Sequence, residues 1–261
     1  MRVVDDVMRV VTLNVWAREG DYPARREVLA TGFAGLAPDL VVLQETIVAS
    51  DFDQAAEILP SGLEIVHSGR RAHDGMGVSL ASRWPITQVE ELALDGSRRD
   101  DGFPCVTLIA TIQAPGLDAP LRFVNHFPSW KPQQELERER QAVQAAGHLE
   151  QLDGHVIIAG DFDADPHAAS MRFWTGRQSL AGISVCYRDA WAKTHPDIPL
   201  ATFSPTENPL VADADWPHQQ IDHLLVRCGE HGGPTLPIHD CRRVFDETPA
   251  SDHFGLLAEL G

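Results

Sequence analysis

Polar and acidic residues stand at the ends of several short apolar runs, at points where the chain is expected to enter or leave a buried core. Carboxylate, amide and imidazole groups can bind divalent cations, orient water and stabilise charge on phosphate. In layered α/β proteins such residues gather at one rim of the strands, where loops present them to a ligand. We therefore expect one metal-assisted site that cleaves phosphate esters. The residues concerned are Asn14, Gln44-Glu45, Asn125-His126, Gly160-Asp161-Phe162-Asp163, Asp222 and Ser251-Asp252-His253.

Glu45 is a candidate metal ligand. It follows the apolar run at 40–43, so we expect its carboxylate to emerge where this strand ends. A carboxylate oxygen at such a place suits Mg²⁺ or Mn²⁺. Taken alone, Glu45 could equally cap a turn or helix before Ser50.

The segment 160–166 presents carboxylates at alternating positions, as a calcium-binding loop does. A calcium loop is excluded because Pro166 stands where glycine is needed and Arg172 where glutamate is needed. Asp165 is expected to be the N-cap of a helix over 166–174, with proline at its first position. Asp161 and Asp163 remain to face the site.

Two histidines can act on phosphate. His126 leaves a strand end, from which an imidazole can donate to a phosphoryl oxygen, although a single histidine there is more often structural. His253 needs an anionic partner to stay oriented and protonated, and either Asp222 or Asp252 can supply it. The sequence contains no Gly-x-Ser-x-Gly elbow, so a serine nucleophile is not indicated.

Short apolar runs along the chain predict strands. Several runs are continuous rather than alternating, as in strands that are covered on both faces. They lie at 10–13, 40–43, 77–81, 106–109, 121–124, 156–159 and 224–226.

Helices are predicted at 23–36 and 133–152, each with one apolar stripe beneath a charged face. The stripes consist of Val28, Leu29, Phe33 and Leu36 in the first and Leu136, Val143, Ala146 and Leu149 in the second. Strands joined only by turns fall between 77 and 124, which favours mixed sheets with hairpins over a purely parallel sheet. We expect one domain over 1–261, since no repeat or Gly/Ser linker divides it.

The composition is that of an acidic globular protein. Lys and Arg total 21 against 38 Asp and Glu, which gives a formal charge of −17. Such a surface repels a duplex phosphate backbone unless a local basic patch intervenes. A bound cation can still reverse the sign inside a site rich in carboxylates, so a phosphorylated substrate remains compatible.

The four cysteines show neither CxxC spacing nor zinc-finger histidines, which favours reduced thiols. No stretch approaches the roughly 20 apolar residues of a membrane span, and the first strand begins too early to leave room for a leader. We expect a soluble cytoplasmic protein, although the mature form of an exported protein would show the same features.

In this order and spacing, the motifs strongly resemble those of the endonuclease/exonuclease/phosphatase superfamily, whose fold is that of DNase I. The resemblance covers residues 9–260 and includes the segment 75–86, which is similar to a strand-loop segment of the family. The motifs that carry it are Leu13-Asn14-Val15, Gln44-Glu45, Asn125-His126-Phe127, Gly160-Asp161-Phe162-Asp163, Ile221-Asp222-His223 and Ser251-Asp252-His253.

The resemblance implies a four-layer α/β sandwich, with two mixed β-sheets packed face to face and helices outside. It also implies hydrolysis of a phosphoester by water with the help of Mg²⁺ or a similar ion. Glu45 would be the principal metal ligand, with Asn14 and Asp252 completing or supporting its shell.

The resemblance further implies the roles of the catalytic groups. Asp161 would orient and deprotonate the attacking water, and His126 would donate to the phosphoryl oxygens. His253, held by Asp222, would stabilise charge in the transition state. We expect Asn125 to contact the substrate, together with Asn208 and Trp216 of the long loop 196–217.

Two positions depart from the family's usual pattern. Asp163 stands where asparagine is common, and a carboxylate can only accept a hydrogen bond unless it is protonated. Asp163 therefore binds a second cation, carries a proton or has another task. His223 stands where tyrosine is usual, which we interpret as a packing substitution.

The leading functional hypothesis is a divalent-metal-dependent phosphoesterase that acts on a small or lipid-like phosphodiester or phosphomonoester. A nuclease acting on DNA or RNA is the second hypothesis, because basic residues could form a local patch. They are Arg70-Arg71, Arg98-Arg99, Trp130-Lys131 and the segment 172–177. A binding protein that keeps the fold without catalysis is the third.

Overall fold

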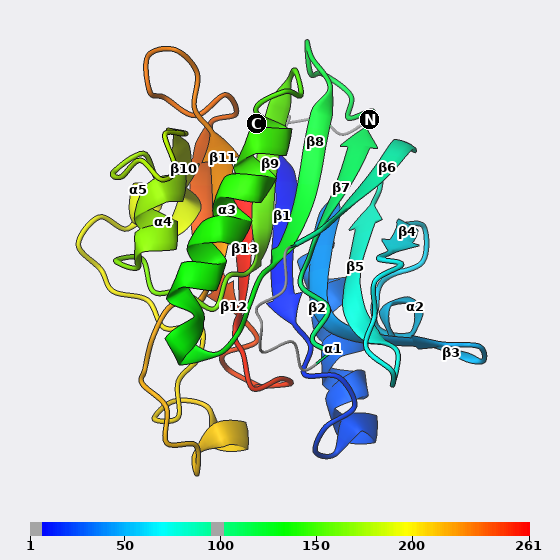
Figure 1. Ribbon diagram of the computed structural model, residues 1–261. Helices are drawn as coiled ribbons and strands as arrows, with labels where there is room; N and C mark the ends of the chain where they lie inside the picture. Colours follow the sequence, from blue (N-terminus) through cyan, green and yellow to red (C-terminus); the bar gives the residue numbers. More distant parts are fainter. Residues whose placement is uncertain (1–6, 95–101) are drawn as a thin grey trace.

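Two β-sheets packed face to face form the centre of the protein (Figure 1). The computed structural model describes residues 7–94 and 102–261. One sheet has the strand order β12-β13-β1-β2-β5-β4, with β3 paired to β2, and the other has the order β10-β11-β9-β8-β7-β6.

The first sheet consists of β1 (Met8–Asn14), β2 (Leu40–Ala49), β3 (Phe52–Asp53), β4 (Glu64–His67), β5 (Met76–Ser82), β12 (Ile238–Val244) and β13 (Gly255–Leu260). The second consists of β6 (Ile86–Ala93), β7 (Val106–Ile112), β8 (Leu121–Phe127), β9 (His155–Asp161), β10 (Tyr187–Asp189) and β11 (Asp222–Arg227). Each sheet contains one parallel pair, β1 with β2 and β8 with β9, among antiparallel neighbours. The predicted mixed sheets are therefore confirmed.

Helices cover the outer face of each sheet. α1 (Tyr22–Leu36) and α2 (Gln54–Ile58) pack on the first sheet through residues such as Leu29 and Phe33. α3 (Glu135–Leu149) and α4 (Ala169–Trp174) pack on the second, and α5 (Ala190–Thr194) contacts β11 and β12. The predicted four-layer α/β sandwich is confirmed.

The core between the sheets explains why the strands have continuous apolar sequences. Side chains from both sheets meet there, among them Val10, Val42, Phe123 and Ile157. The alternate side chains of the same strands pack beneath the outer helices. All seven predicted runs are strands. Their burial on both faces explains why their sequences are continuously apolar. Within the described ranges, no helix is long and apolar enough to cross a membrane.

The boundaries of the two predicted helices near the site differ from the prediction. The segment 133–152 begins with a 3₁₀ turn over Pro132–Gln134 and continues as α3. Leu136, which we assigned to the buried stripe, is 52% exposed. Ala146 and Leu149 of the predicted stripe are buried, and Ala142 and Ala145 complete the buried face.

The helix predicted over 166–174 begins only at Ala169, as α4. Asp165 is therefore not its N-cap. Its Oδ1 accepts the backbone N–H of His167 at 2.9 Å and closes a turn ahead of the helix.

Gly160 lets β9 approach β8 closely at the rim that carries the candidate site. A Cβ atom at this position would lie 2.1 Å from the backbone oxygen of His126. No side-chain rearrangement can relieve such a contact, because the obstructing atom is backbone.

We predict that Gly160→Ala lowers the free energy of unfolding by at least about 2 kcal/mol, the scale of overpacking in a rigid core. Gly147→Ala on α3 is the control, since nothing lies within 4 Å of its added methyl group and alanine favours helix. Urea unfolding of both variants measures the difference. Equal midpoints for the two variants would contradict the steric argument.

Candidate active site

Glu45 lies in a β-bulge in the middle of β2, so the prediction that it ends a strand is wrong. The pairing of β2 with β5 aligns Leu43 with Ser79 and then Thr46 with Gly77, which leaves one extra residue on β2. Glu45 has a φ of 59°, a left-handed conformation that costs a non-glycine residue about 1 kcal/mol or more. A local bulge, and not a chain exit, presents this carboxylate.

Asn14, the last residue of β1, connects the carboxylates of the two sheets. Its Nδ2 donates to Glu45 Oε1 and to Asp161 Oδ2, each at 3.0 Å. Its Oδ1 accepts the backbone N–H of Trp16 at 2.9 Å. Because the amide nitrogen donates to both carboxylates, Asn14 supports Glu45 and Asp161 from between the two sheets.

Asp161, the last residue of β9, is 2% exposed. Burial raises the pKa of its carboxyl group to about 6, against the lowering effect of His253 and of the hydrogen bonds from Asn14 and from the backbone of Asp163. A carboxylate with such a pKa can accept a proton near neutral pH.

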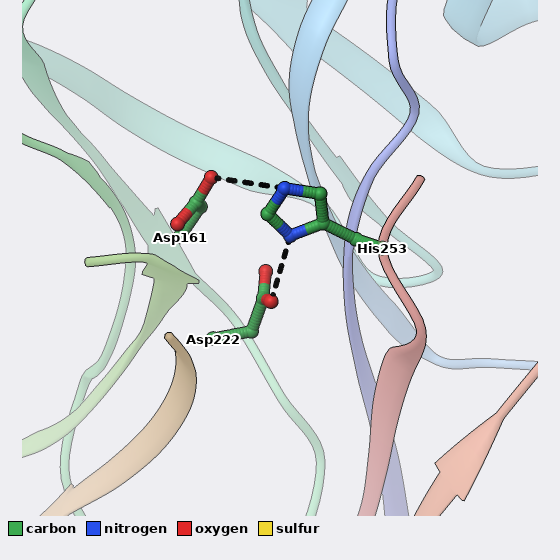
Figure 2. A group of neighbouring side chains, drawn as sticks. All are labelled: Asp161, Asp222 and His253. Atoms are coloured by element: carbon green, nitrogen blue, oxygen red, sulfur yellow. Dashed lines mark hydrogen bonds and ion pairs between the residues drawn. The ribbon is translucent and has the colours of Figure 1, made fainter. Parts of the chain in front are cut away.

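His253 lies between two carboxylates (Figure 2). Its Nδ1 is 2.9 Å from Asp222 Oδ2, and its Nε2 is 3.8 Å from Asp161 Oδ2. Burial alone would lower the pKa of His253, but the charges of Asp222, Asp161 and Asp252 raise it well above its usual range. Of the two partners that the sequence left open, the structure pairs His253 with Asp222. The ring is thus held as a cation whose Nε2–H points to the site.

Glu45 and Asp252 form a second acidic pair. Burial and the charge of Asp252 raise the pKa of Glu45 to about 7, and burial raises the pKa of Asp252. The hydrogen bonds recorded for these carboxylates come from neutral groups, Asn14 to Glu45 and Ser251 to Asp252. Among residues 7–94 and 102–261, neither carboxylate has a directly bonded cationic partner, and such a pair fits a hard divalent ion with oxygen ligands.

A second group with metal-like spacing consists of Asp161, Asp222 and His253, whose ligand atoms lie within 4.8 Å of one another. One of its two negative charges is already compensated, because a protonated imidazole lies between the two carboxylates. A protonated imidazole offers no lone pair to a metal. Glu45 and Asp252 therefore fit a divalent cation better.

Arg25 is a buried part of the site that the sequence analysis missed. It extends from α1, is 4% exposed, and its guanidinium lies 4.9 Å from the ring of Trp16. Its charge interacts with Asp252 and Glu45. It donates to the backbone oxygens of Val15, Trp16, Ala17, Glu19 and Ala250. Arg25 thereby fixes the chain segments that follow β1 and precede Asp252.

Asn125 lies between the sheets and not at a substrate surface. It is fully buried, its Oδ1 accepts from Gln44 at 2.8 Å, and its Nδ2 donates to the backbone oxygens of Leu43 and Ser79. Its hydrogen-bonding groups are thus engaged within the protein. The expected substrate contact is not supported, and Asn125 instead fixes the bulge from its inner side.

His126 faces the opposite side of β8, beneath the outer helices. Its ring lies 5.0 Å from that of Phe162 and 5.6 Å from that of Trp174, and its Nδ1 is 2.9 Å from Thr107 Oγ1. Burial lowers its pKa to about 3, so the ring is neutral. Because side chains alternate along a strand, His126 points away from the inter-sheet rim, and donation to a phosphoryl oxygen is not supported.

The long loop brings Trp216, but not Asn208, to an accessible wall of the site. Asn208 is 1% exposed and donates to the backbone oxygens of Ser251 and Asp252, so it positions these residues. Trp216 is 37% exposed and packs at 6.1 Å against Phe203, whose ring lies 5.4 Å from His253.

Asp163 is a buried carboxyl group beside Asp161. Its Oδ2 has no hydrogen-bond partner among the described residues. Burial and the charge of Asp161 raise its pKa well above the usual range. Either a proton or a cation must compensate this group.

His223 lies on the face of β11 opposite to Asp222. Its Nδ1 is 3.0 Å from Asp189 Oδ2 and its Nε2 is 2.9 Å from the backbone oxygen of Ala164. The fully buried ring thus ties β10 and the segment after β9 to β11, which agrees with a packing substitution.

Comparison with known proteins agrees with this arrangement. A model of the Endonuclease/Exonuclease/phosphatase family matches residues 11–253. No curated protein sequence gives a significant match.

Solved structures share the fold at low sequence identity. D. rerio TDP2 in complex with single strand DNA product is 19% identical, with a TM-score of 0.76 over 98% of this chain and 100% of that chain. A mannosyl-6-phosphatase from Bacteroides thetaiotaomicron is 18% identical, with a TM-score of 0.71 over 97% and 99% of the two chains. The human Nocturnin catalytic domain with bound sulfate is 14% identical, with a TM-score of 0.71 over 98% and 94%.

We predict that Glu45→Gln stabilises the metal-free protein above pH 7. The folded state keeps the Glu45 proton up to about pH 7, whereas the unfolded chain loses it near the usual glutamate pKa of 4.5. The stability of the wild type therefore falls as the pH rises through this window. Glutamine carries no charge and so removes the cost of ionising Glu45 in the folded protein, which is about 2 kcal/mol for a partly buried carboxyl group. Urea unfolding at pH 5 and pH 8 in chelator measures it.

The exposed residue Glu230 provides the control, as Glu230→Gln. Mg²⁺ should raise the wild-type and control midpoints at pH 8 and leave Glu45→Gln unchanged. A Glu45→Gln variant that Mg²⁺ stabilises as much as the wild type would rule out Glu45 as a ligand.

Proposed function

The chain belongs to the endonuclease/exonuclease/phosphatase family, and from this premise we propose that it is a divalent-metal-dependent hydrolase of phosphoester bonds. The observation that carries the proposal is the His253 ring, held between Asp222 and Asp161 at the inter-sheet rim. When water attacks phosphorus, a carboxylate can accept the proton of the water, and a cationic donor can stabilise the charge on the phosphoryl oxygens.

Asp161 is the general base in this proposal. It is oriented by Asn14 Nδ2 and by the backbone N–H of Asp163. A water held at its carboxylate loses a proton to it during attack on phosphorus. A pKa of about 6 leaves this carboxylate ionised near neutral pH while keeping it basic enough to accept the proton.

His253 stabilises the charge that develops on the phosphoryl oxygens. Asp222 accepts the Nδ1 proton and fixes the ring plane. Nε2 is too far from Asp161, at 3.8 Å, for a hydrogen bond, so its proton is directed to a substrate oxygen. Asp222 acts through His253 and is a positioning residue.

Glu45 and Asp252 would hold Mg²⁺ or Mn²⁺, with Asn14 supporting Glu45. Such an ion supplies charge neutralisation at the phosphoryl group. The raised pKa of Glu45 supports this assignment, since the protein itself leaves the two carboxylates repelling each other.

A small-molecule or lipid-like phosphodiester or phosphomonoester is the substrate class that we propose. The charge of −17 opposes a long polyanion. Two of the basic groups considered for a nucleic-acid patch are engaged inside the protein: Arg71 donates to backbone oxygens around the bulge, and Arg172 donates to Gln178. Arg98-Arg99 lies outside the described residues.

Trp216 and Phe203 offer an aromatic wall beside His253 for an apolar part of the substrate. A nuclease is the second candidate, because the similar D. rerio TDP2 structure contains a single strand DNA product. The exposed Trp130, with Lys131 Nζ at 5.5 Å from its ring, resembles the stacking platforms that bind single strands.

A hydrolysis panel with Mg²⁺ or Mn²⁺ separates these candidates. It contains sugar phosphates, aryl phosphodiesters, phosphoinositides, sphingomyelin, and single-stranded DNA and RNA. We expect turnover of a small or lipid-like ester. Cleavage of nucleic acid alone would establish the nuclease instead, and no turnover of any substrate would favour a binding protein without catalysis.

We predict that Glu45→Ala, Asp161→Ala and His253→Ala each reduce turnover by at least about a hundredfold, because each removes an acid-base or electrostatic group. Thermal melting should show that all three still fold. Asp118→Ala serves as control, since that side chain is 94% exposed. Unchanged turnover in the three site variants would refute the assignment.

Asp163 binds a second cation in this proposal. Its buried, unpartnered Oδ2 supports an additional ligand there. Titration with Mn²⁺ should show one fewer bound ion in Asp163→Asn than in the wild type. An equal stoichiometry would indicate that a proton compensates Asp163.

A further inference from the structure

A chain of hydrogen bonds lies behind the Glu45 bulge, on the helix-covered side of the first sheet. Thr46 Oγ1 is 2.7 Å from Ser79 Oγ, and Ser79 Oγ is 2.8 Å from His67 Nδ1. His67 Nε2 is 3.1 Å from Asp53 Oδ2. The chain thus runs from the first residue after Glu45, across β5 and β4, to the residue that precedes α2.

The direction of these hydrogen bonds follows from their last member. Asp53 is a carboxylate and only accepts, so His67 donates from Nε2. Burial lowers the pKa of His67, and in the neutral ring Nδ1 must then accept from the Ser79 hydroxyl. Ser79 has a single proton, so the remaining contact requires Thr46 to donate to Ser79. Thr46 Oγ1 also lies 3.3 Å from the backbone oxygen of Gly77, but the Ser79 oxygen is the nearer acceptor for its single proton.

Arg71 occupies the gap that the bulge opens in the β2–β5 ladder. Its Nη1 donates to the backbone oxygens of Thr46 and Gly75 at 2.8 and 2.9 Å, and its Nη2 donates to that of Val78 at 2.9 Å. Nη2 also lies 3.5 Å from Ser79 Oγ. One guanidinium therefore bonds carbonyl groups of both strands where regular pairing is interrupted.

The order Ser79, His67, Asp53 resembles a hydrolytic triad, but burial argues against a nucleophile. Ser79 is 1% exposed and Thr46 is fully buried. A nucleophilic hydroxyl must reach the substrate, whereas the Ser79 oxygen is enclosed by Thr46, His67 and Arg71. A positioning role agrees with this arrangement.

We propose that Ser79, with His67 and Arg71, locks the bulge of β2 and so holds Glu45 in place for metal binding. This inference rests on the proposed metal site of Glu45 and Asp252. Glu45 adopts a left-handed conformation that an unsupported glutamate avoids. Asn125 holds the same strands from the inner side through Leu43 and Ser79, so the bulge is bonded on both faces.

The test compares two serine-to-alanine variants on one strand. Ser79→Ala breaks the chain at its central hydroxyl. Ser82→Ala is the matched control, because Ser82 is also fully buried on β5 and its hydroxyl donates to the backbone oxygen of Trp84 at 2.8 Å, outside the bulge. Ser82→Ala thus removes a buried hydroxyl that bonds only the backbone of Trp84, whereas Ser79→Ala removes the one that joins Thr46 to His67.

We expect Ser79→Ala to weaken Mg²⁺ binding by about tenfold in calorimetry, the lower end of what loss of a partner outside the ligand shell causes. In the metal-free protein, amide hydrogen exchange at 43–47 should quicken only in Ser79→Ala. Turnover should fall at low Mg²⁺ and recover at saturating Mg²⁺. Ser82→Ala should match the wild type in each measurement.

Equal Mg²⁺ affinity and equal exchange at 43–47 in the two variants would overturn the proposal. Failure of the proposed function gives a different result: a wild type that neither binds Mg²⁺ nor hydrolyses phosphoesters. Faster exchange in Ser79→Ala would then still support the lock on the bulge, while refuting its connection to a metal.

Discussion

The hydrogen bonds of Asn14 determine the arrangement of the candidate site. One amide nitrogen donates to Glu45 of the first sheet and to Asp161 of the second, each at 3.0 Å. Because each strand is fixed in its sheet by a ladder of hydrogen bonds, this contact sets how the carboxylates of two separate sheets meet at one rim. Around it lie His253, paired with Asp222, and Asp252, close enough to raise the pKa of Glu45.

Burial of charge at this rim costs stability and provides reactivity. Burial is the largest factor raising the pKa values of Glu45, Asp161 and Asp163, and the left-handed backbone of Glu45 adds strain. The surrounding structure compensates through Arg25 on one side and Arg71 on the other, both bonded largely to backbone oxygens. These arginines thus support the loops and strands around the site. Strain of this kind is common where a site must be preorganised.

The layers of the fold could be predicted because strands covered on both faces have continuous apolar sequences. β6 and β12 escaped prediction because they lie at sheet edges and carry exposed polar residues. The sequence identified the types of the site residues, but it did not always indicate which way their side chains face. The bulge at Glu45 depends on how β2 pairs with β5, and a shift of one residue separates Asn125, which faces the core, from His126, which faces the helices. Arg25 carries no signal in a single sequence, since its partners are backbone oxygens from distant segments.

The most direct test of this account is the position of a bound cation. The structure of the protein with Mn²⁺, determined by crystallography with anomalous scattering, locates the ion without reference to activity. We predict a peak coordinated by Glu45 and Asp252, with Asn14 beside it and the hydrogen bond between His253 and Asp222 intact. A peak only among Asp161, Asp222 and His253, or none at millimolar Mn²⁺, would contradict it.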